Sequence, residues 1–295
     1  MNSQIRNPKS EIRNSLPIGI FDSGVGGLTV YRALHECLPN EHFVYLGDTA
    51  RVPYGTKSLS TVERYAIENS RFLEAHGIKL LVVACNTASA LALPAIRAAV
   101  GVTVVGVIGP GARAAAKIAN GKKVAVIATE ATVQSGAYAE AISRSDPSIS
   151  VIERACPLFV PLAEEGWGAS DVARAVAEQY LRDLREEDLG ALVLGCTHYP
   201  ILRELISEVV GAEVPLIDSG AAAAAEVQAL LESNQLAATQ PETAPRVRAL
   251  CDDLDHFYVT DAAERFAKVA ERFLGTAPAV LEAVEIWGHD ELRTN

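Results

Sequence analysis

The sequence predicts an α/β fold made of two similar units with mainly parallel sheets and an active site in the cleft between them. Two observations support this prediction. Short apolar runs that suit buried strands alternate with helical segments along the chain of 295 residues, which is the pattern of βαβ proteins. In addition, three strand–turn–helix segments recur at a nearly constant distance further along the chain, which indicates an internal duplication.

The apolar run from Leu80 to Ala84 illustrates how the elements are recognised. Its five residues fit a strand that is buried on both faces. Asn86 and Thr87 follow it after Cys85, and both are good helix N-caps, so a helix is expected to start there. The same reasoning predicts strands over 17–21, 42–46, 80–84, 102–108, 122–128, 149–153, 191–195, 214–217 and 247–251. It predicts helices over 28–37, 60–76, 170–184, 221–231 and 260–274, and further helices after the strands that end at 84, 128 and 195.

The internal repeat aligns two of the cysteines. The segment LVVACNTAS around Cys85 matches LVLGCTHYP around Cys196, 111 positions later. Two further pairs of segments are 109 and 107 positions apart, namely VVGVIGPGARAA with AEVPLIDSGAAAA and PIGIFDSG with VAVIATEAT. We therefore expect the two cysteines to occupy the same place in two pseudo-symmetric units.

The composition fits a globular protein that keeps its cysteines reduced. Hydrophobic residues make up 49% of the chain and charged residues 21%, which supports a sizeable core. The net charge of −11 disfavours nucleic acid and anionic membranes as partners. The five cysteines lack CxxC spacing, which argues against a disulfide framework and a zinc ribbon. We expect a cytoplasmic protein with no nucleic-acid or membrane partner; the sequence does not report the oligomeric state, and a homodimer is one option.

The duplication predicts that Cys85 and Cys196 face each other across one binding site. Ligands of open α/β sheets bind beyond the carboxyl ends of the strands, and each cysteine follows such an end. A helix start favours negative charge, so we expect it to lower the pKa of the Cys85 thiol. Two thiols on opposite sides of one carbon suit the inversion of a stereocentre, because one removes a proton and the other returns one. For either thiol considered alone, the alternative is burial as an ordinary apolar side chain.

Other polar side chains lie on the same side of the predicted first sheet. Asp22 and Asp48 end strands there, and each is either a helix cap or a part of the site. Arg51 and Lys57 flank the turn at 54–55, where a solvated surface is the alternative.

Known cofactor and metal motifs do not explain these residues. The glycine-rich loop over 24–27 departs from the dinucleotide fingerprint, because Thr29 stands where the third glycine belongs. The P-loop, HExxH and GxSxG patterns are absent from the sequence. Cys196 and His198 have a spacing that suits metal ligands, but no further ligands cluster near them in the sequence, so no metal is expected. His198 fits better as a catalytic neighbour of the thiol, and no cofactor is expected.

Six segments of the chain form motifs that are specific enough to indicate a family. They are GIFDSGVGGLTV (19–30), YLGDTARVPYG (45–55), ACNTAS (84–89), CPLFVPL (156–162), LGCTHYP (194–200) and FYVTDAAERFAKVAERFLG (257–275). With these motifs the chain resembles the glutamate racemases of the aspartate/glutamate racemase family from about Gly19 to Val284. The resemblance implies a cofactor-independent isomerase that interconverts L-glutamate and D-glutamate and supplies D-glutamate for peptidoglycan.

The resemblance also implies roles for individual residues. Cys85 deprotonates the D-isomer and Cys196 the L-isomer. Asp22 assists Cys85, and His198 together with Glu164 assists Cys196. The implied substrate contacts are mostly hydroxyls, amides and backbone N–H groups, which suit carboxylates: Asp22, Ser23, Pro53, Tyr54, Gly55, Asn86, Thr87, Thr129, Thr197 and His198.

Two of these assignments depend on detail in the motifs. The choice of Glu164 rather than Glu165 depends on the register of that segment. Ala128 stands where the family usually has glycine, so its methyl group is expected to tighten the loop next to Thr129.

The resemblance further implies how the chain is divided. Residues 16–109 and 221–295 form a discontinuous first α/β domain, and residues 110–220 form the second. Residues 1–15 are expected to be a disordered extension that adds no chemistry.

Two alternatives remain open. A racemase of the same family that acts on aspartate or another amino acid is the nearest one, although Ser89 after CNTA and the triplet at 198–200 favour glutamate. A two-domain amino-acid-binding protein is the alternative from another class. It would not need paired thiols, and it would release its ligand chemically unchanged.

Overall fold

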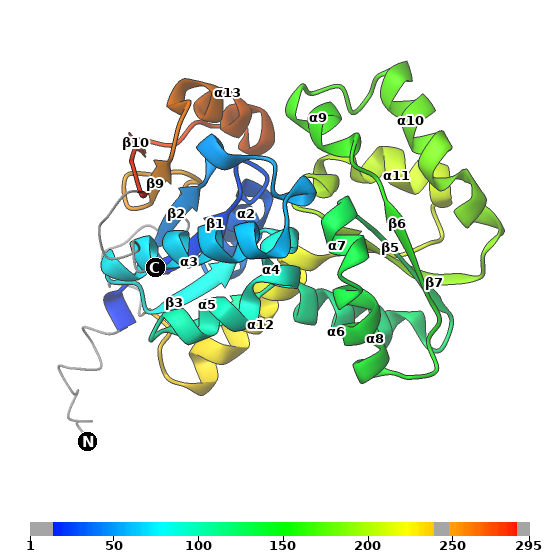
Figure 1. Ribbon diagram of the computed structural model, residues 1–295, viewed down its shortest axis with the longest axis horizontal. Helices are drawn as coiled ribbons and strands as arrows, with labels where there is room; N and C mark the ends of the chain where they lie inside the picture. The colour runs from blue at the N-terminus through cyan, green and yellow to red at the C-terminus, as the bar shows by residue number, and fades with distance from the viewer. Residues whose placement is uncertain (1–13, 239–247, 288–295) are drawn as a thin grey trace.

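Two separate parallel sheets, each covered by helices, lie side by side in the computed structural model, which describes residues 14–238 and 248–287 (Figure 1). Most of the predicted N-terminal extension therefore lies outside the described residues. Its last part is anchored, because the carbonyl of Asn14 accepts a hydrogen bond from Lys79 Nζ at 2.7 Å.

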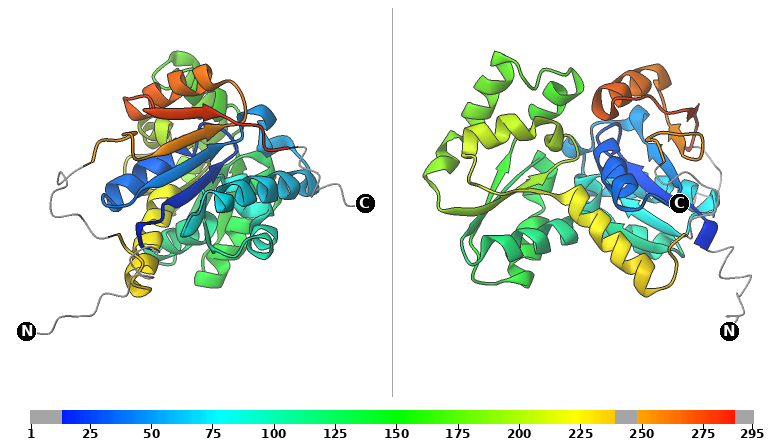
Figure 2. Two further views of the ribbon diagram at one scale, coloured as in Figure 1. Left: turned by 90° about the vertical axis from the view of Figure 1, so that its left-hand side faces the viewer. Right: turned by 180° about the vertical axis from the view of Figure 1, so that it is seen from behind.

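The first sheet has six strands in the order β10-β9-β2-β1-β3-β4, and all of its neighbouring strands are parallel. Its strands are β1 (Ile18–Asp22), β2 (Phe43–Gly47), β3 (Leu80–Val83), β4 (Thr103–Gly106), β9 (His256–Val259) and β10 (Val280–Ala283). Every residue of β1, β2 and β3 is buried, as expected for a parallel sheet that is covered on both faces. Figure 2 shows β9 and β10, from the end of the chain, continuing this sheet beyond β2.

The second sheet has four parallel strands in the order β6-β5-β7-β8. Its strands are β5 (Lys123–Ala128), β6 (Val151–Ala155), β7 (Leu189–Gly195) and β8 (Leu216–Asp218). This order repeats β2-β1-β3-β4 of the first sheet strand for strand. The prediction of two pseudo-symmetric parallel-sheet units is confirmed, and β3 and β7, which precede the two cysteines, occupy equivalent places.

Helices connect the strands along the described residues. The α-helices are α2 (Leu28–Cys37), α3 (Leu59–Ala75), α4 (Asn86–Leu91), α5 (Leu93–Ala99), α6 (Ile108–Ala119), α7 (Glu130–Gln134), α8 (Ala137–Ser145), α9 (Phe159–Glu164), α10 (Asp171–Leu181), α11 (Arg203–Val210), α12 (Ser219–Ser233) and α13 (Ala263–Leu274). Short 3₁₀ helices are η1 (Thr49–Arg51), η2 (Tyr54–Thr56), η3 (Arg182–Glu186) and η4 (Tyr199–Leu202).

Side-chain caps begin several of these helices, as the sequence suggests. The hydroxyls of Ser58 and Ser170 accept hydrogen bonds from the first turns of α3 and α10, and Asp218 does the same for α12. Thr129 caps α7 in the same way. The caps at Thr129 and Asp218 lie directly at the carboxyl ends of β5 and β8, which is the edge of a sheet where ligands bind in this architecture.

The prediction of a strand over 247–251 is wrong for residues 248–251, and residue 247 lies outside the described residues. Cys251 has a left-handed backbone with φ of +60°, which does not continue a strand. Its N–H donates to the hydroxyl of Tyr31 at 2.7 Å instead of to a neighbouring strand. The strand of this region forms later, at β9, and β10 was not predicted.

Helix α12 joins the two halves of the molecule. It packs against α2 beside the first sheet and against α6 beside the second, and Figure 2 shows it passing along the junction. Val227 and Leu231 of α12 are fully buried, so the helix belongs to the core on both sides. We propose the division predicted from the sequence, with the chain entering the second unit near residue 110 and leaving it near residue 220.

Candidate active site

One cavity between the two sheets contains both repeated cysteines. It has a volume of about 70 Å³ and lies beyond the carboxyl ends of β1 and β3 on one side and of β5 and β7 on the other. The residues that line it are Ser23, Gly24, Val25, Val52, Pro53, Tyr54, Gly55, Cys85, Asn86, Thr87, Thr129, Val160, Glu164, Cys196, Thr197 and His198. The structure therefore brings together every site residue expected from the sequence except Asp22, which lies buried just behind the wall.

A second cavity of about 290 Å³ adjoins the first and shares Pro53, Thr129 and Glu164 with it. Val52 and Val160 line both spaces, and Val52 is 49% exposed. The outer cavity therefore lies against the inner one on a side of the molecule where Val52 reaches the surface. The inner cavity is the smaller of the two, and it is the one that both thiols line.

The Cys85 thiol caps the helix that follows its strand. The N–H of Ala88 lies 3.5 Å from Cys85 Sγ, and Cys85 is the N-cap of α4. The expectation that Asn86 or Thr87 would cap this helix is wrong. Both lie inside its first turn, so their side chains are available for other contacts.

Burial governs the acidity of the Cys85 thiol. Loss of solvent and the nearby Asp22 carboxylate raise the pKa of Cys85 to about 12, although Ser23 and the N–H of Ala88 act in the opposite direction. The N–H of Ala88 in the first turn of α4 acts in the expected direction, but burial outweighs it, so the expectation of a lowered pKa for Cys85 is wrong. At neutral pH this thiol keeps its proton.

Asp22 lies beneath the cavity at the end of β1. Its Oδ2 accepts a hydrogen bond from the N–H of Gly24 at 2.9 Å, and its Oδ1 has no partner within the described residues. Burial raises the pKa of this carboxyl, and the charge of His198 and the N–H groups of the loop offset part of the rise. A buried carboxyl with a free oxygen is suited to holding or accepting a proton near Cys85.

The glycine-rich loop over 24–27 allows close approach rather than dinucleotide binding. A Cβ atom at Gly26 would lie 2.2 Å from Thr197 Oγ1 and 2.5 Å from the His198 ring. The Thr29 hydroxyl, where a dinucleotide fingerprint has glycine, donates to the carbonyl of Thr197 at 2.8 Å. The loop of the first unit thus holds the active segment of the second unit in place.

The Cys196 thiol lies at the end of a chain of polar side chains. Cys196 Sγ is 3.8 Å from His198 Nδ1, and His198 Nε2 is 3.1 Å from Glu164 Oε1. Glu164 Oε2 contacts Arg265 at 3.2 Å. The structure places Glu164 at the histidine, whereas Glu165 is exposed to solvent.

This chain of contacts keeps His198 positively charged. Burial alone would lower the pKa of the imidazole, but the hydrogen bonds to Cys196 and Glu164 outweigh it and raise the pKa of His198 to about 10. The same contact with His198 overcomes burial at Glu164 and lowers the pKa of that carboxyl. The positively charged ring of His198 therefore lies 3.8 Å from Cys196 Sγ.

Three hydroxyls meet where the two units touch beside the cavity. Thr87 Oγ1 lies 3.0 Å from Thr129 Oγ1 and 3.2 Å from Thr132 Oγ1, and the latter two are 2.9 Å apart. Thr132 was not anticipated, because its role depends on a neighbour from the other unit. Ala128 is fully buried at the end of β5 and leaves Thr129 at the cavity.

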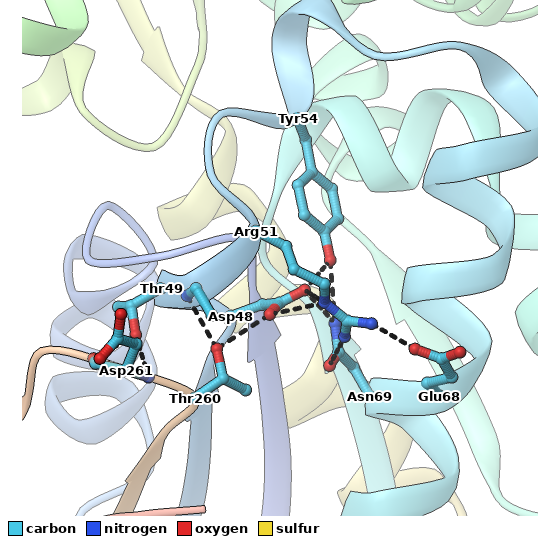
Figure 3. Close-up of polar contacts among 9 residues, drawn as sticks. Asp48, Thr49, Arg51, Tyr54, Glu68, Asn69, Thr260 and Asp261 are labelled. Atoms are coloured by element: carbon cyan, nitrogen blue, oxygen red, sulfur yellow. Dashed lines mark hydrogen bonds and ion pairs between the residues drawn. The ribbon is translucent and has the colours of Figure 1, made fainter. Parts of the chain in front are cut away.

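A buried carboxylate organises the wall at 52–55 (Figure 3). Asp48 is fully buried and accepts hydrogen bonds from Arg51 Nε at 2.8 and 2.9 Å and from Thr260 Oγ1 at 2.9 Å. The Tyr54 hydroxyl and the side-chain amide of Asn69 donate to the same carboxylate. Asp48 stands at the N-terminus of η1, but its side chain makes no capping bond there and does not line the cavity, so the side chain fills neither of the two roles considered for it above.

Arg51 is fully used inside this network. Its guanidinium donates to Asp48 and Glu68, and it stacks 4.1 Å from the centre of the Tyr65 ring. The interpretation of Arg51 as a solvated residue is therefore wrong, and the side chain is not free to bind a ligand. The network holds the Tyr54 side chain in place, and the neighbouring residues 52, 53 and 55 line the cavity beside it.

Some lining residues were not anticipated at all. Val25, Val52 and Val160 form the apolar part of the cavity wall. A single apolar side chain in the sequence does not show whether it will line a cavity or pack in the core.

Among the described residues, no three His, Cys, Asp or Glu side chains are grouped as metal ligands would be. No helix within 14–238 or 248–287 is long and apolar enough to cross a membrane.

Comparison with known proteins points to one family. The family model of Asp/Glu/Hydantoin racemases matches residues 18–227. A glutamate racemase of Geobacter metallireducens is 51% identical over 258 residues, which are 88% of this chain and 92% of the relative.

Solved structures agree with the sequence comparison. The crystal structure of glutamate racemase from Francisella tularensis with D-glutamate is 39% identical and has a TM-score of 0.83, covering 94% of this chain and all of that one. The structure of Escherichia coli glutamate racemase with L-glutamate is 32% identical and has a TM-score of 0.73, covering 92% and 100%. The chain belongs to the Asp/Glu/hydantoin racemase family, in its glutamate racemase branch.

Proposed function

We propose that this protein interconverts L-glutamate and D-glutamate with two thiols that act on opposite faces of the α-carbon. The observation that carries the proposal is that Cys85 and Cys196, from equivalent positions of two repeated units, line one small cavity. A single base tends to return a proton to the face it came from, whereas two facing groups invert the centre.

The reaction moves two protons and leaves the electron count unchanged. In the L-to-D direction, the Cys196 thiolate takes the α-proton and the C–H electron pair stays on carbon. That carbon then takes the proton of the Cys85 thiol on its other face, which leaves a Cys85 thiolate and a Cys196 thiol. The D-to-L direction is the reverse, so each turnover begins from the protonation state that the opposite reaction leaves.

The surroundings of each thiol support this assignment. The imidazolium of His198 lies 3.8 Å from Cys196 Sγ, while burial and Asp22 raise the pKa of Cys85. We propose that Asp22 and His198, the latter held by Glu164, assist the proton transfers on their own sides.

The difficult step is the formation of negative charge next to an unactivated carboxylate. Preorganised donors commonly supply the largest part of such stabilisation. The donor-bearing side chains that line this cavity are those of Ser23, Asn86, Thr87, Thr129 and Thr197. For each tenfold increase in rate, these donors must lower the activation free energy by about 1.4 kcal/mol. The proposed mechanism uses no cofactor.

Glutamate is proposed as substrate because two similar solved structures, the glutamate racemases of Francisella tularensis and Escherichia coli, contain D-glutamate and L-glutamate. Ser89, which favoured glutamate in the sequence, does not line the cavity. Its hydroxyl donates to the carbonyl of Val83 at 2.8 Å within the first unit, so it contributes to the fold rather than to substrate contact. Aspartate remains the alternative substrate.

The test is chiral chromatography after incubation of the purified protein with L-glutamate, D-glutamate and L-aspartate. Equal amounts of both glutamate enantiomers from either start, with aspartate changed far more slowly, support the proposal. Unchanged L-glutamate would overturn it.

In the cell, we propose that the enzyme works in the cytoplasm and supplies D-glutamate for peptidoglycan. Reduced thiols, which the reaction requires, persist in that compartment. Depletion of the protein should then be rescued by added D-glutamate. Whether it acts as a homodimer is read directly from its mass in solution by light scattering.

A further inference from the structure

Tyr138 of α8 makes a contact that the proposed mechanism does not yet use. The side chain is fully buried, and its hydroxyl lies 2.6 Å from Asn86 Oδ1 in the other unit. Asn86 directly follows Cys85 and lines the cavity, whereas Tyr138 does not line it. A buried tyrosine thus reaches across the junction to a residue beside the first thiol.

The length of this contact identifies which end of the Asn86 amide faces the tyrosine. A separation of 2.6 Å lies within the range of O–H···O bonds and below the usual range of N–H···O bonds. Ser219 Oγ approaches the same oxygen at 3.4 Å. Because two hydroxyls gather at Oδ1, the NH₂ end of the amide is the end left for the cavity, where it can donate to a carboxylate.

The ring of Tyr138 is tied to the second thiol as well. A Cβ atom at Gly195 would lie 3.1 Å from one edge of the ring, and a Cβ at Gly111 would lie 3.5 Å from the other. Gly195 directly precedes Cys196, so its lack of a side chain lets the ring pack against the chain beside that thiol. The single proton of the Ser219 hydroxyl is shared between Asn86 Oδ1 at 3.4 Å and the carbonyl of Leu194 at 3.0 Å, so Ser219 links Asn86 to the strand that precedes Cys196.

We propose that Tyr138 is a positioning residue that orients the Asn86 amide and holds the two thiol-bearing segments at a fixed separation. Its hydroxyl holds Oδ1 away from the cavity, so that the amide presents two N–H donors to the substrate. Its ring spaces the segment before Cys196 from the helix after Cys85. The inference rests on the proposed function, because it assigns the amide to a carboxylate of that substrate.

The first test is Tyr138→Phe, which removes one hydroxyl and keeps the ring. An amide free to turn presents oxygen to a carboxylate part of the time, so we expect the KM for both enantiomers to rise about tenfold, with kcat changed less than about threefold. The matched control is Tyr31→Phe. Tyr31 is also fully buried, and its hydroxyl donates to Asp255 at 2.8 Å, away from the cavity. The control should lose thermal stability without a change in KM.

A double-mutant cycle with Asn86→Ala separates positioning from general softening of the fold. If Tyr138 acts through the amide, Tyr138→Phe should change KM less than about twofold once Asn86 is alanine. An undiminished effect in that background, or an equal rise in KM for Tyr31→Phe, would overturn the inference.

A second variant covers the case in which Tyr138→Phe does not fold. Ser219→Ala removes the other hydroxyl at Oδ1 and should raise KM about threefold, again only while Asn86 is present. An unchanged KM would overturn the inference. The outcomes remain distinguishable from failure of the proposed function: a wild-type protein that does not racemise glutamate refutes the function, whereas an active wild type with an unchanged Tyr138→Phe variant refutes only the role of Tyr138.

Discussion

The two halves of the cavity share a backbone plan and differ in charge. Cys85 and Cys196 follow equivalent strands, β3 and β7, in sheets of the same order. Yet a carboxylate, Asp22, lies near the first thiol, and an imidazolium, His198, lies near the second. Duplication therefore explains where the two thiols lie, whereas the residues next to each thiol give the two sides of the cavity their different charges.

The difference teaches that two equivalent thiols lie in unequal electrostatic surroundings. A two-base inversion needs one thiolate and one thiol at the same time. Two identical surroundings would not distinguish the thiol that gives up its proton from the thiol that keeps it. Here the contacts that run from His198 through Glu164 to Arg265 place positive charge beside Cys196, whereas a carboxyl group, Asp22, lies near Cys85.

The largest expected effect comes from removing either thiol. Cys85→Ser and Cys196→Ser should each lower racemisation by about 10⁴-fold, the upper range for a positioned acid or base. The two losses should be similar because each turnover uses both groups. Chiral chromatography measures the effect, and Cys37→Ser, a cysteine outside the cavity, serves as control. Wild-type rates in either catalytic variant would refute the two-thiol mechanism.

The next largest effect tests the charged side. His198→Asn should lower kcat/KM by about 100-fold. In the wild type, activity that needs the imidazolium should be full below its pKa and fall as the pH rises through about 10. The variant should lack this fall. A pH–rate profile from 6 to 11 tests whether His198 causes the alkaline fall in activity. If the same fall is seen in His198→Asn, another group causes it.

A smaller effect on activity is expected from Glu164, the residue that contacts His198 on the side away from Cys196. Glu164→Gln removes the carboxylate that holds His198 at 3.1 Å, which should lower kcat about tenfold. It should also move the alkaline limb to lower pH, because one cause of the raised histidine pKa is lost. Glu165→Gln, at the exposed neighbour, should behave as wild type. Equal effects of the two variants would contradict the assignment of Glu164.

The smallest kinetic effect concerns the wall on the Cys85 side. Arg51→Met leaves the buried Asp48 without its cation, and Lys79→Met does the same to Glu41 in a buried pair of 2.5 Å outside the cavity. Both variants should lose about 3 kcal/mol of unfolding free energy. Only Arg51→Met should raise KM, by about threefold, because its network fixes Tyr54. Denaturant melts and KM values measured together test this, and matching KM values would contradict it.

The sequence predicted most of the fold because its signals are local and repeated. The buried run at 80–84 and its counterpart before Cys196 report a strand and its carboxyl end without any distant partner. The misplaced strand at 248–251 shows the limit. There, the N–H of Cys251 donates to the hydroxyl of Tyr31, 220 positions away in sequence, instead of to a neighbouring strand. No local sequence pattern predicts such a contact.

The site was predicted only as far as residue identity carries information. Twelve of the thirteen expected residues line the cavity, and Asp22 lies behind it. The raised pKa of Cys85, the burial of Arg51 and the contact of Tyr138 with Asn86 were not predictable. Each depends on what packs against the side chain from elsewhere in the chain, which sequence periodicity does not show.

The most direct test of the unequal thiols is exchange of the α-hydrogen with solvent in the two single-thiol variants. In deuterated water, Cys85→Ser retains only Cys196 and should exchange the α-hydrogen of L-glutamate but not of D-glutamate. Cys196→Ser should show the reverse preference. NMR of the recovered amino acid gives both rates. Exchange of both enantiomers by either variant, or of neither by both, would contradict the assignment of one thiol to each face.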